Sequence, residues 1–161
     1  MTERDNIVNF LKISDELITI IVERRVYHFV FPRQQTILPL IHNAHEAVQL
    51  RLKKAIEHIN HIKDDELIER LEQNGLTGAE WVFKVTIAER HINSVRKKIQ
   101  DIPFQYEDKL DNRSGNQRRT LKRYIRRALK SIDVILDSII TAGVPIHPYK
   151  EFKDSLLSMF E

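Results

Sequence analysis

The chain contains no cysteine among its 161 residues. Disulfide bonds, zinc sites built from thiolates and cysteine nucleophiles are therefore excluded. Glycine and proline are also scarce, with four and five residues, which is little turn material for an all-β fold. This composition predicts a helical protein, and the lack of cysteine fits a cytoplasmic one.

The sequence also lacks a long hydrophobic run. Its most apolar stretch, residues 17–31, is interrupted by Glu23, Arg24 and Arg25, whereas a membrane-spanning helix needs about 20 predominantly apolar residues. The N-terminal sequence MTERDNIVNF does not have the basic and then apolar order of a signal peptide. We therefore expect neither a membrane span nor export.

The size and composition of the chain predict one folded domain over residues 1–161. A chain of 161 residues can bury one continuous core. Its hydrophobic share of 42% and its charged share of 30% lie far from the range of disordered proteins. We find no internal repeat and no low-complexity tract.

Apolar residues recur at helical spacing in four long segments. The first segment spans about residues 5–31, and the second spans about residues 36–62. The third follows the capping sequence 77–80 and ends before Pro103. The fourth follows a polar loop at 104–115 and ends at Ala142-Gly143. The second segment has its apolar residues at spacings of three and four, namely Ile37, Ile41, Ala44, Val48, Leu52, Ala55, Ile59 and Ile62.

Four long amphipathic segments joined by short links are typical of a helix bundle. The predicted fold is all-α, an antiparallel four-helix bundle with a short connector helix at 64–72 and a C-terminal capping helix at 148–160. Apolar residues cover more than half the circumference of the first helix, so we expect it to pack on two neighbours. This excess apolar surface also predicts a homo-oligomer or a subunit of a complex.

Positive charge is concentrated in the fourth segment. Residues 112–131 contain no acid and carry eight cations, namely Arg113, Arg118, Arg119, Lys122, Arg123, Arg126, Arg127 and Lys130. The remaining 18 Lys and Arg face 23 Asp and Glu, so the rest of the chain carries a net charge of −5 although the whole chain is +3. The sequence therefore predicts an electrically polarised molecule.

Most of these cations share one side of the predicted helix. At about 100° per residue, the six from Arg119 to Lys130 lie opposite the apolar seam, with Arg118 nearer its edge. The guanidinium group of arginine can donate two hydrogen bonds to one phosphate group. Binding of cationic side chains also releases counterions from a nucleic acid, which favours association and makes the affinity depend on salt. We therefore predict a non-enzymatic helical domain that binds the backbone of RNA or DNA, or another polyanion, through these residues.

Two other interpretations account for the same charge pattern. The basic face can bind an acidic protein, in which case the chain is an interaction adaptor. It can also be balanced within the molecule, for example by the acids of the connector helix between Asp64 and Glu72. Tyr124 is the one aromatic residue among the cations, so stacking on bases is not favoured.

Histidines suggest a metal site only weakly. Four of the seven lie in the second segment, at 42, 45, 58 and 61. Two of them point away from the apolar seam, and no carboxylate projects into the predicted core as a di-metal bundle requires. We expect no metal and no cofactor, since glycine-rich phosphate loops and serine nucleophile motifs are also missing.

An enzymatic alternative rests on Arg51 and His58, which lie seven residues apart on the same flank of the second helix. This spacing is similar to the Arg–His motif of the HEPN ribonuclease superfamily of small helical bundles. The resemblance implies a metal-free ribonuclease in which His58 acts as general acid or base and Arg51 steadies the phosphorane. Leu52 departs from that motif, because the family commonly has a polar residue after the arginine.

Overall fold

The computed structural model describes residues 2–24, 26, 30, 38–101, 112–144 and 146–160, and helix is the regular structure found in them. The helices are α1 (Glu3–Glu23), α3 (Leu38–His61), α4 (Asp64–Gln73), α5 (Ala79–Asp101), α6 (Asn112–Thr141) and α7 (His147–Phe160). The predicted all-α class is confirmed. None of the described helices is both long enough and apolar enough to cross a membrane.

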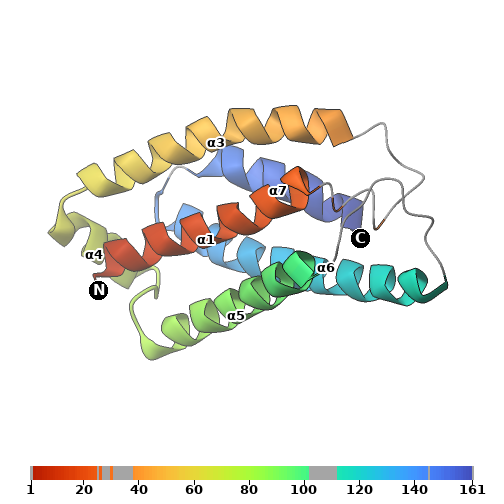
Figure 1. Cartoon of the computed structure of the whole chain (residues 1–161). Helices are drawn as coiled ribbons and strands as arrows, with labels where there is room; N and C mark the ends of the chain where they lie inside the picture. The colour runs from red at the N-terminus through yellow and green to blue at the C-terminus, as the bar shows by residue number, and fades with distance from the viewer. Residues whose placement is uncertain are drawn as a thin grey trace.

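The main helix contacts close a ring. α1 packs on α3 and α5, α5 packs on α6, α6 on α7, and α7 on α3, while α4 touches α1. Figure 1 shows α1 in front, between α3 and α5, with α6 and α7 behind it. The C-terminal helix is therefore one wall of the ring and covers its side toward α3 and α6.

Helix directions follow from contacts at known positions. The side chain of Thr19, late in α1, lies 3.2 Å from His45 and 3.2 Å from Gln49, early in α3. At the other end, Arg4 of α1 lies 2.7 Å from Asp64, just after α3. α1 and α3 are therefore antiparallel.

α1 and α5, in contrast, run in the same direction (Figure 1). Glu16, late in α1, pairs with Arg96, late in α5, at 3.1 Å. A ring of five helices cannot alternate direction throughout, because five is odd. The predicted antiparallel four-helix arrangement is not confirmed, since two of the four long helices are parallel neighbours.

The buried seams of α5 and α6 match the predicted spacing. In α5 the buried residues include Trp81, Ala88, Ile92, Val95 and Ile99, and the seam of α6 from Leu121 to Ile139 is buried as well. Ile37 and the side chain of Ile41, at the start of the predicted seam of α3, lie outside the described residues; among the rest the seam differs at one position, because Ala44 is exposed and His45 is buried, with 3% of its surface exposed. His45 can occupy the interior because Thr19 provides a hydrogen-bond partner.

Glycines follow the ends of two helices, and the second of these ends, at Ala142-Gly143, was predicted. Gly75 and Gly143 have φ values of 72° and 98°, in the left-handed region that favours glycine. The backbone N–H of Leu76 donates to the carbonyl of Leu71 at 2.8 Å after the first turn, and Val144 donates to Ile139 at 3.3 Å after the second. The helix α6 begins at Asn112, so it includes the last four residues of the predicted loop 104–115.

The wide apolar surface of α1 is covered within the chain. Its buried residues include Ile7, Phe10, Leu11, Leu17 and Ile21, and α3, α4 and α5 all pack against this helix. The first helix has more than one neighbour, as predicted. Its apolar surface no longer supports an oligomer, and oligomerisation stays a prediction without that argument.

Candidate functional site

The predicted basic residues lie on α6, in its N-terminal half. Arg119, Arg123, Arg127 and Lys130 are exposed, and Arg118, Lys122 and Arg126 are half-buried. Arg113 belongs to the same helix, but its side chain is outside the described residues. The seven described cations thus all reach the surface, while the seam of α6 faces the core.

α5 contributes cations to the same region, which the sequence analysis did not anticipate. His91 of α5 contacts Ser131 of α6, and Lys98 contacts Tyr124, so the antiparallel pairing brings the C-terminal half of α5 beside the N-terminal half of α6. Residues 90–100 of α5 contain four cations and no acid; one of them, Arg96, pairs with Glu16 of α1, and Lys98 lies over Tyr124 of α6. The basic surface therefore extends over two helices.

Three cations converge on the ring of Tyr124. The Nζ atom of Lys98 lies 4.5 Å from the ring centroid, and the guanidinium carbons of Arg123 and Arg127 each lie 5.7 Å from it. A cation near the face of an aromatic ring gains about 0.5–1 kcal/mol at exposed sites. We call Lys98, Arg123, Tyr124 and Arg127 the Tyr124 cluster.

The like charges of the Tyr124 cluster repel one another. Arg123 and Arg127 are four residues apart on one helix, a spacing at which like charges destabilise the helix by a few tenths of a kcal/mol. Tyr124 moderates this repulsion but supplies no negative charge. An anion that contacts both arginines and Lys98 would relieve the repulsion and bind with charge-assisted hydrogen bonds.

His91 lies at the edge of this cluster. Its Nδ1 atom is 2.7 Å from the Ser131 hydroxyl oxygen. Burial lowers the pKa of His91, and the positive charge of Arg127 lowers the pKa further. His91 is therefore neutral at pH 7, and its environment is positive enough to disfavour another cation.

Arg51 and His58 lie apart from this surface. Both side chains are exposed on α3, beside the buried seam that contains Leu52 and Ile59. The groove between α1 and α3 is lined by residues such as Gln49, Lys53 and Glu57, and not by the Arg–His pair. The ribonuclease alternative stays an untested prediction.

The other histidines of α3 are not arranged as metal ligands. His45 faces α1, where it contacts Thr19 and lies 3.7 Å from a carboxylate oxygen of Asp15. His61 contacts the carbonyl of Glu57 on its own helix at 2.6 Å. Within the described part of the chain, no group of three metal-ligating residues was found; the side chain of His42 lies outside it.

A second polar cluster joins α6 to α7 and was not predicted. Lys153 of α7 is fully buried, and its Nζ lies 2.6 Å from Oδ1 of Asp133 and in contact with Asp154. The first contact is an ion pair whose angles are not those of a hydrogen bond. Lys153, Leu156 and Phe160 are all buried and follow helical spacing, so only its charge excluded Lys153 from the predicted core.

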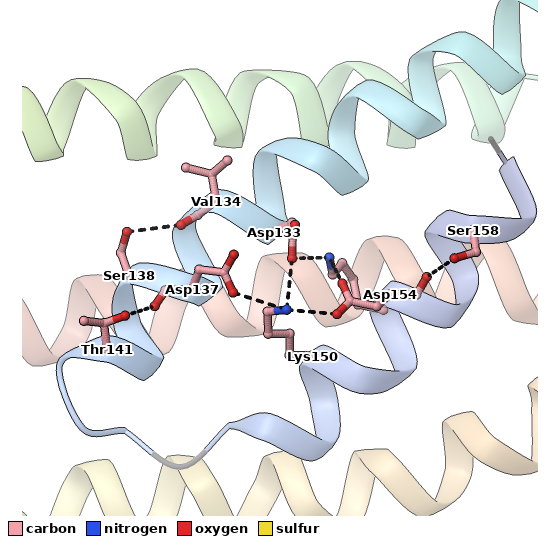
Figure 2. A network of polar contacts seen from close by, with 9 residues as sticks. Asp133, Val134, Asp137, Ser138, Thr141, Lys150, Asp154 and Ser158 are labelled. Atoms are coloured by element: carbon pink, nitrogen blue, oxygen red, sulfur yellow. Dashed lines mark hydrogen bonds and ion pairs between the residues drawn. The ribbon is translucent and has the colours of Figure 1, made fainter.

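Lys150 completes this α6/α7 ion cluster, as Figure 2 shows. Its Nζ lies 2.9 Å from Asp154, 3.2 Å from Asp137 and 3.6 Å from Asp133. Hydrogen bonds to Asp154 and Asp137 raise the pKa of Lys150 strongly, despite an opposing effect of burial. Burial favours a higher pKa for Asp154, but the contact with the ammonium group of Lys153 and the hydrogen bond from Lys150 outweigh it and lower the pKa.

Lys150 and Asp154 therefore stay charged near neutral pH. A lysine with a raised pKa is a poor nucleophile, and a carboxylate with a lowered pKa is a poor base. The three carboxylates and two ammonium groups of the α6/α7 ion cluster instead hold α7 against α6. We regard this cluster as an anchor and the Tyr124 cluster as the candidate functional site.

Comparisons of the chain with protein-family models, with curated proteins and with solved structures found no match.

Replacing both Asp133 and Asp154 with Asn should destabilise the fold, because the fully buried ammonium group of Lys153 would lose both carboxylates. Removing the partner of a buried charge typically costs about 3 kcal/mol or more. Urea denaturation should show this loss for the double variant and about 1 kcal/mol or less for Asp137→Asn, whose exposed carboxylate pairs with Lys150. Equal stability of the double variant and the unmodified protein would contradict the anchoring role.

Proposed function

We propose that the chain binds the phosphate backbone of a nucleic acid through the basic surface of α5 and α6. The observation that carries this proposal is the Tyr124 cluster, in which cations from two helices converge within 6 Å of one ring. Two of the three are arginines, which can donate two parallel hydrogen bonds to a phosphate. The partner is thus expected to be recognised by charge and shape.

The distribution of charge over α6 supports a polyanion rather than a single small anion. Cations continue on both sides of the Tyr124 cluster, from Arg118 to Lys130, a span of about 18 Å at 1.5 Å per residue. Because B-DNA carries one charge per strand about every 3.4 Å, several phosphates fit along this length. A polymer can therefore engage more of these cations at once than a monomeric ligand can.

The contacts of the C-terminal half of α6 indicate that the positive charge of the N-terminal half is not needed for packing. Asp133 and Asp137 of that half meet Lys150 and Lys153 of α7, so α7 is held by acids on α6 and not by its arginines. Arg123 and Arg127 contact a tyrosine ring. Their charge is thus available to a partner at the surface.

Tyr124 itself is expected to position the cations rather than to stack on bases. Its ring is half-buried between α5 and α6, and Lys98 lies over it at 4.5 Å. A base would have to displace that lysine to reach the ring face. Binding should accordingly show little preference for base sequence.

Charge reversal in the Tyr124 cluster tests this proposal. We expect the triple variant Lys98→Glu, Arg123→Glu, Arg127→Glu to bind a labelled single-stranded RNA and a labelled DNA duplex at least about tenfold more weakly, with a salt dependence shallower by about three charges. Fluorescence anisotropy over a series of salt concentrations measures both quantities.

The matched control is the triple variant Lys53→Glu, Lys54→Glu, Lys63→Glu. It changes the net charge by the same amount at three exposed lysines that lie outside the basic surface of α5 and α6. Equal weakening in both variants would show that only the net charge matters. Absence of binding by the unmodified protein at low salt would overturn the proposal and leave an acidic protein as the partner. RNA cleaved during the assay would instead favour the ribonuclease alternative.

Binding should also become tighter as the pH falls. The charge of Arg127 contributes to the low pKa of His91 in the free protein. A phosphate bound to Arg127 would offset that charge, so the complex would hold a proton on His91 that the free protein releases. Affinity should therefore rise as the pH is lowered below the ordinary histidine pKa of about 6.5, because burial still lowers the pKa of His91 in the complex. His91→Gln should remove this part of the pH dependence. If the affinity of that variant depended on pH in the same way as the affinity of the unmodified protein, a phosphate at Arg127 would be contradicted.

A further inference from the structure

A groove between α1 and α5 has the dimensions of a small-molecule site. Its volume is about 450 Å³, within the range of roughly 300–1,000 Å³ that is usual for ligand pockets. The groove follows the two parallel helices, with Asn6 and Asn9 on the side of α1 and Thr86 on the side of α5. Because these side chains are short, they leave space for a ligand above the contact between α1 and α5.

The floor of this groove is apolar. Ile13, Trp81 and Val85 line it, with Trp81 buried and the other two half-buried. On the rim, Val82 keeps 51% of its surface exposed to solvent. An apolar ligand body of modest size would remove this surface from water, which is favourable by about 25 cal/mol per Å².

Carboxylates dominate the charged lining. Glu3, Glu16 and Glu89 line the groove together with one cation, Lys12. Glu16 has an ion-pair partner, because its carboxylate lies 3.1 Å from Arg96.

Glu89 is the carboxylate best placed to attract a cation. It is half-buried and, among the residues that the structure describes, has no ion-pair partner. Burial raises its pKa, so this carboxylate is partly desolvated without compensation. A positively charged ligand would supply the missing partner.

We propose that the α1/α5 groove binds an organic cation with an apolar body, such as an arylalkylamine. Its ammonium group pairs with Glu89, and its apolar part covers Ile13, Val85 and Val82. The site is separate from the Tyr124 cluster, because Val82, Thr86 and Glu89 share one side of α5 whereas His91 and Lys98 face α6. The groove and the basic surface thus attract ligands of opposite charge.

Trp81 makes this proposal directly testable, because it is the only tryptophan in the chain. Its fluorescence would be followed during titration with 4-phenylbutylamine and with the uncharged 4-phenylbutanol. The amine should cause a saturable change, and the alcohol should bind at least about tenfold more weakly, since it cannot form a charge-assisted hydrogen bond to Glu89. No saturable change with the amine, or equal binding of both compounds, would overturn the proposal.

Two variants locate the interaction. Glu89→Gln should weaken binding of the amine by about tenfold or more and leave binding of the alcohol unchanged. The control Glu80→Gln makes the same change at an exposed position of α5 outside the groove and should bind the amine normally. Val82→Arg should abolish amine binding by placing a cation on the rim; retained binding in both Glu89→Gln and Val82→Arg would exclude this groove as the site.

Discussion

The buried ion pair between Lys153 of α7 and Asp133 of α6 is the contact on which the arrangement of helices depends. α7 joins α6 to α3, so this pair helps to close the ring around the core. A fully buried ammonium group is costly unless it is paired, and two carboxylates, those of Asp133 and Asp154, surround this one. The pairing therefore specifies which side of α6 faces α7, and with it the rotation of α6 about its own axis.

The rotation of α6 determines which side chains of its N-terminal half are exposed to solvent. The helix carries cations up to Lys130 and carboxylates at Asp133 and Asp137. With its seam in the core and its acids against α7, the arginines reach the surface beside α5. Lys98 then adds to their charge at Tyr124. The proposed binding surface is thus a consequence of how α6 is held, although its charged side chains lie on the side of α6 that faces away from the core.

Local spacing predicted much of this structure. The seams of α5 and α6 and the C-terminal end of α6 follow from apolar residues at intervals of three and four and from Gly143, because these signals act within one helix. Relations between helices were not predictable in this way. The parallel neighbours α1 and α5 and the pairing of Lys98 with Tyr124 depend on tertiary packing. Lys153 and His45 replaced apolar residues in the interior because partners on α6 and α1, distant in sequence, compensate their burial.

Mapping the bound surface by nuclear magnetic resonance would test the central claim most directly. In a titration of the isotopically labelled protein with a short single-stranded RNA at low salt, backbone amide signals would be followed residue by residue. The proposal predicts that the largest shifts fall in residues 90–98 of α5 and 118–131 of α6 and disappear when salt is raised. Shifts centred on α1 and α3, or no shifts at RNA concentrations that saturate ordinary nonspecific binding, would contradict it.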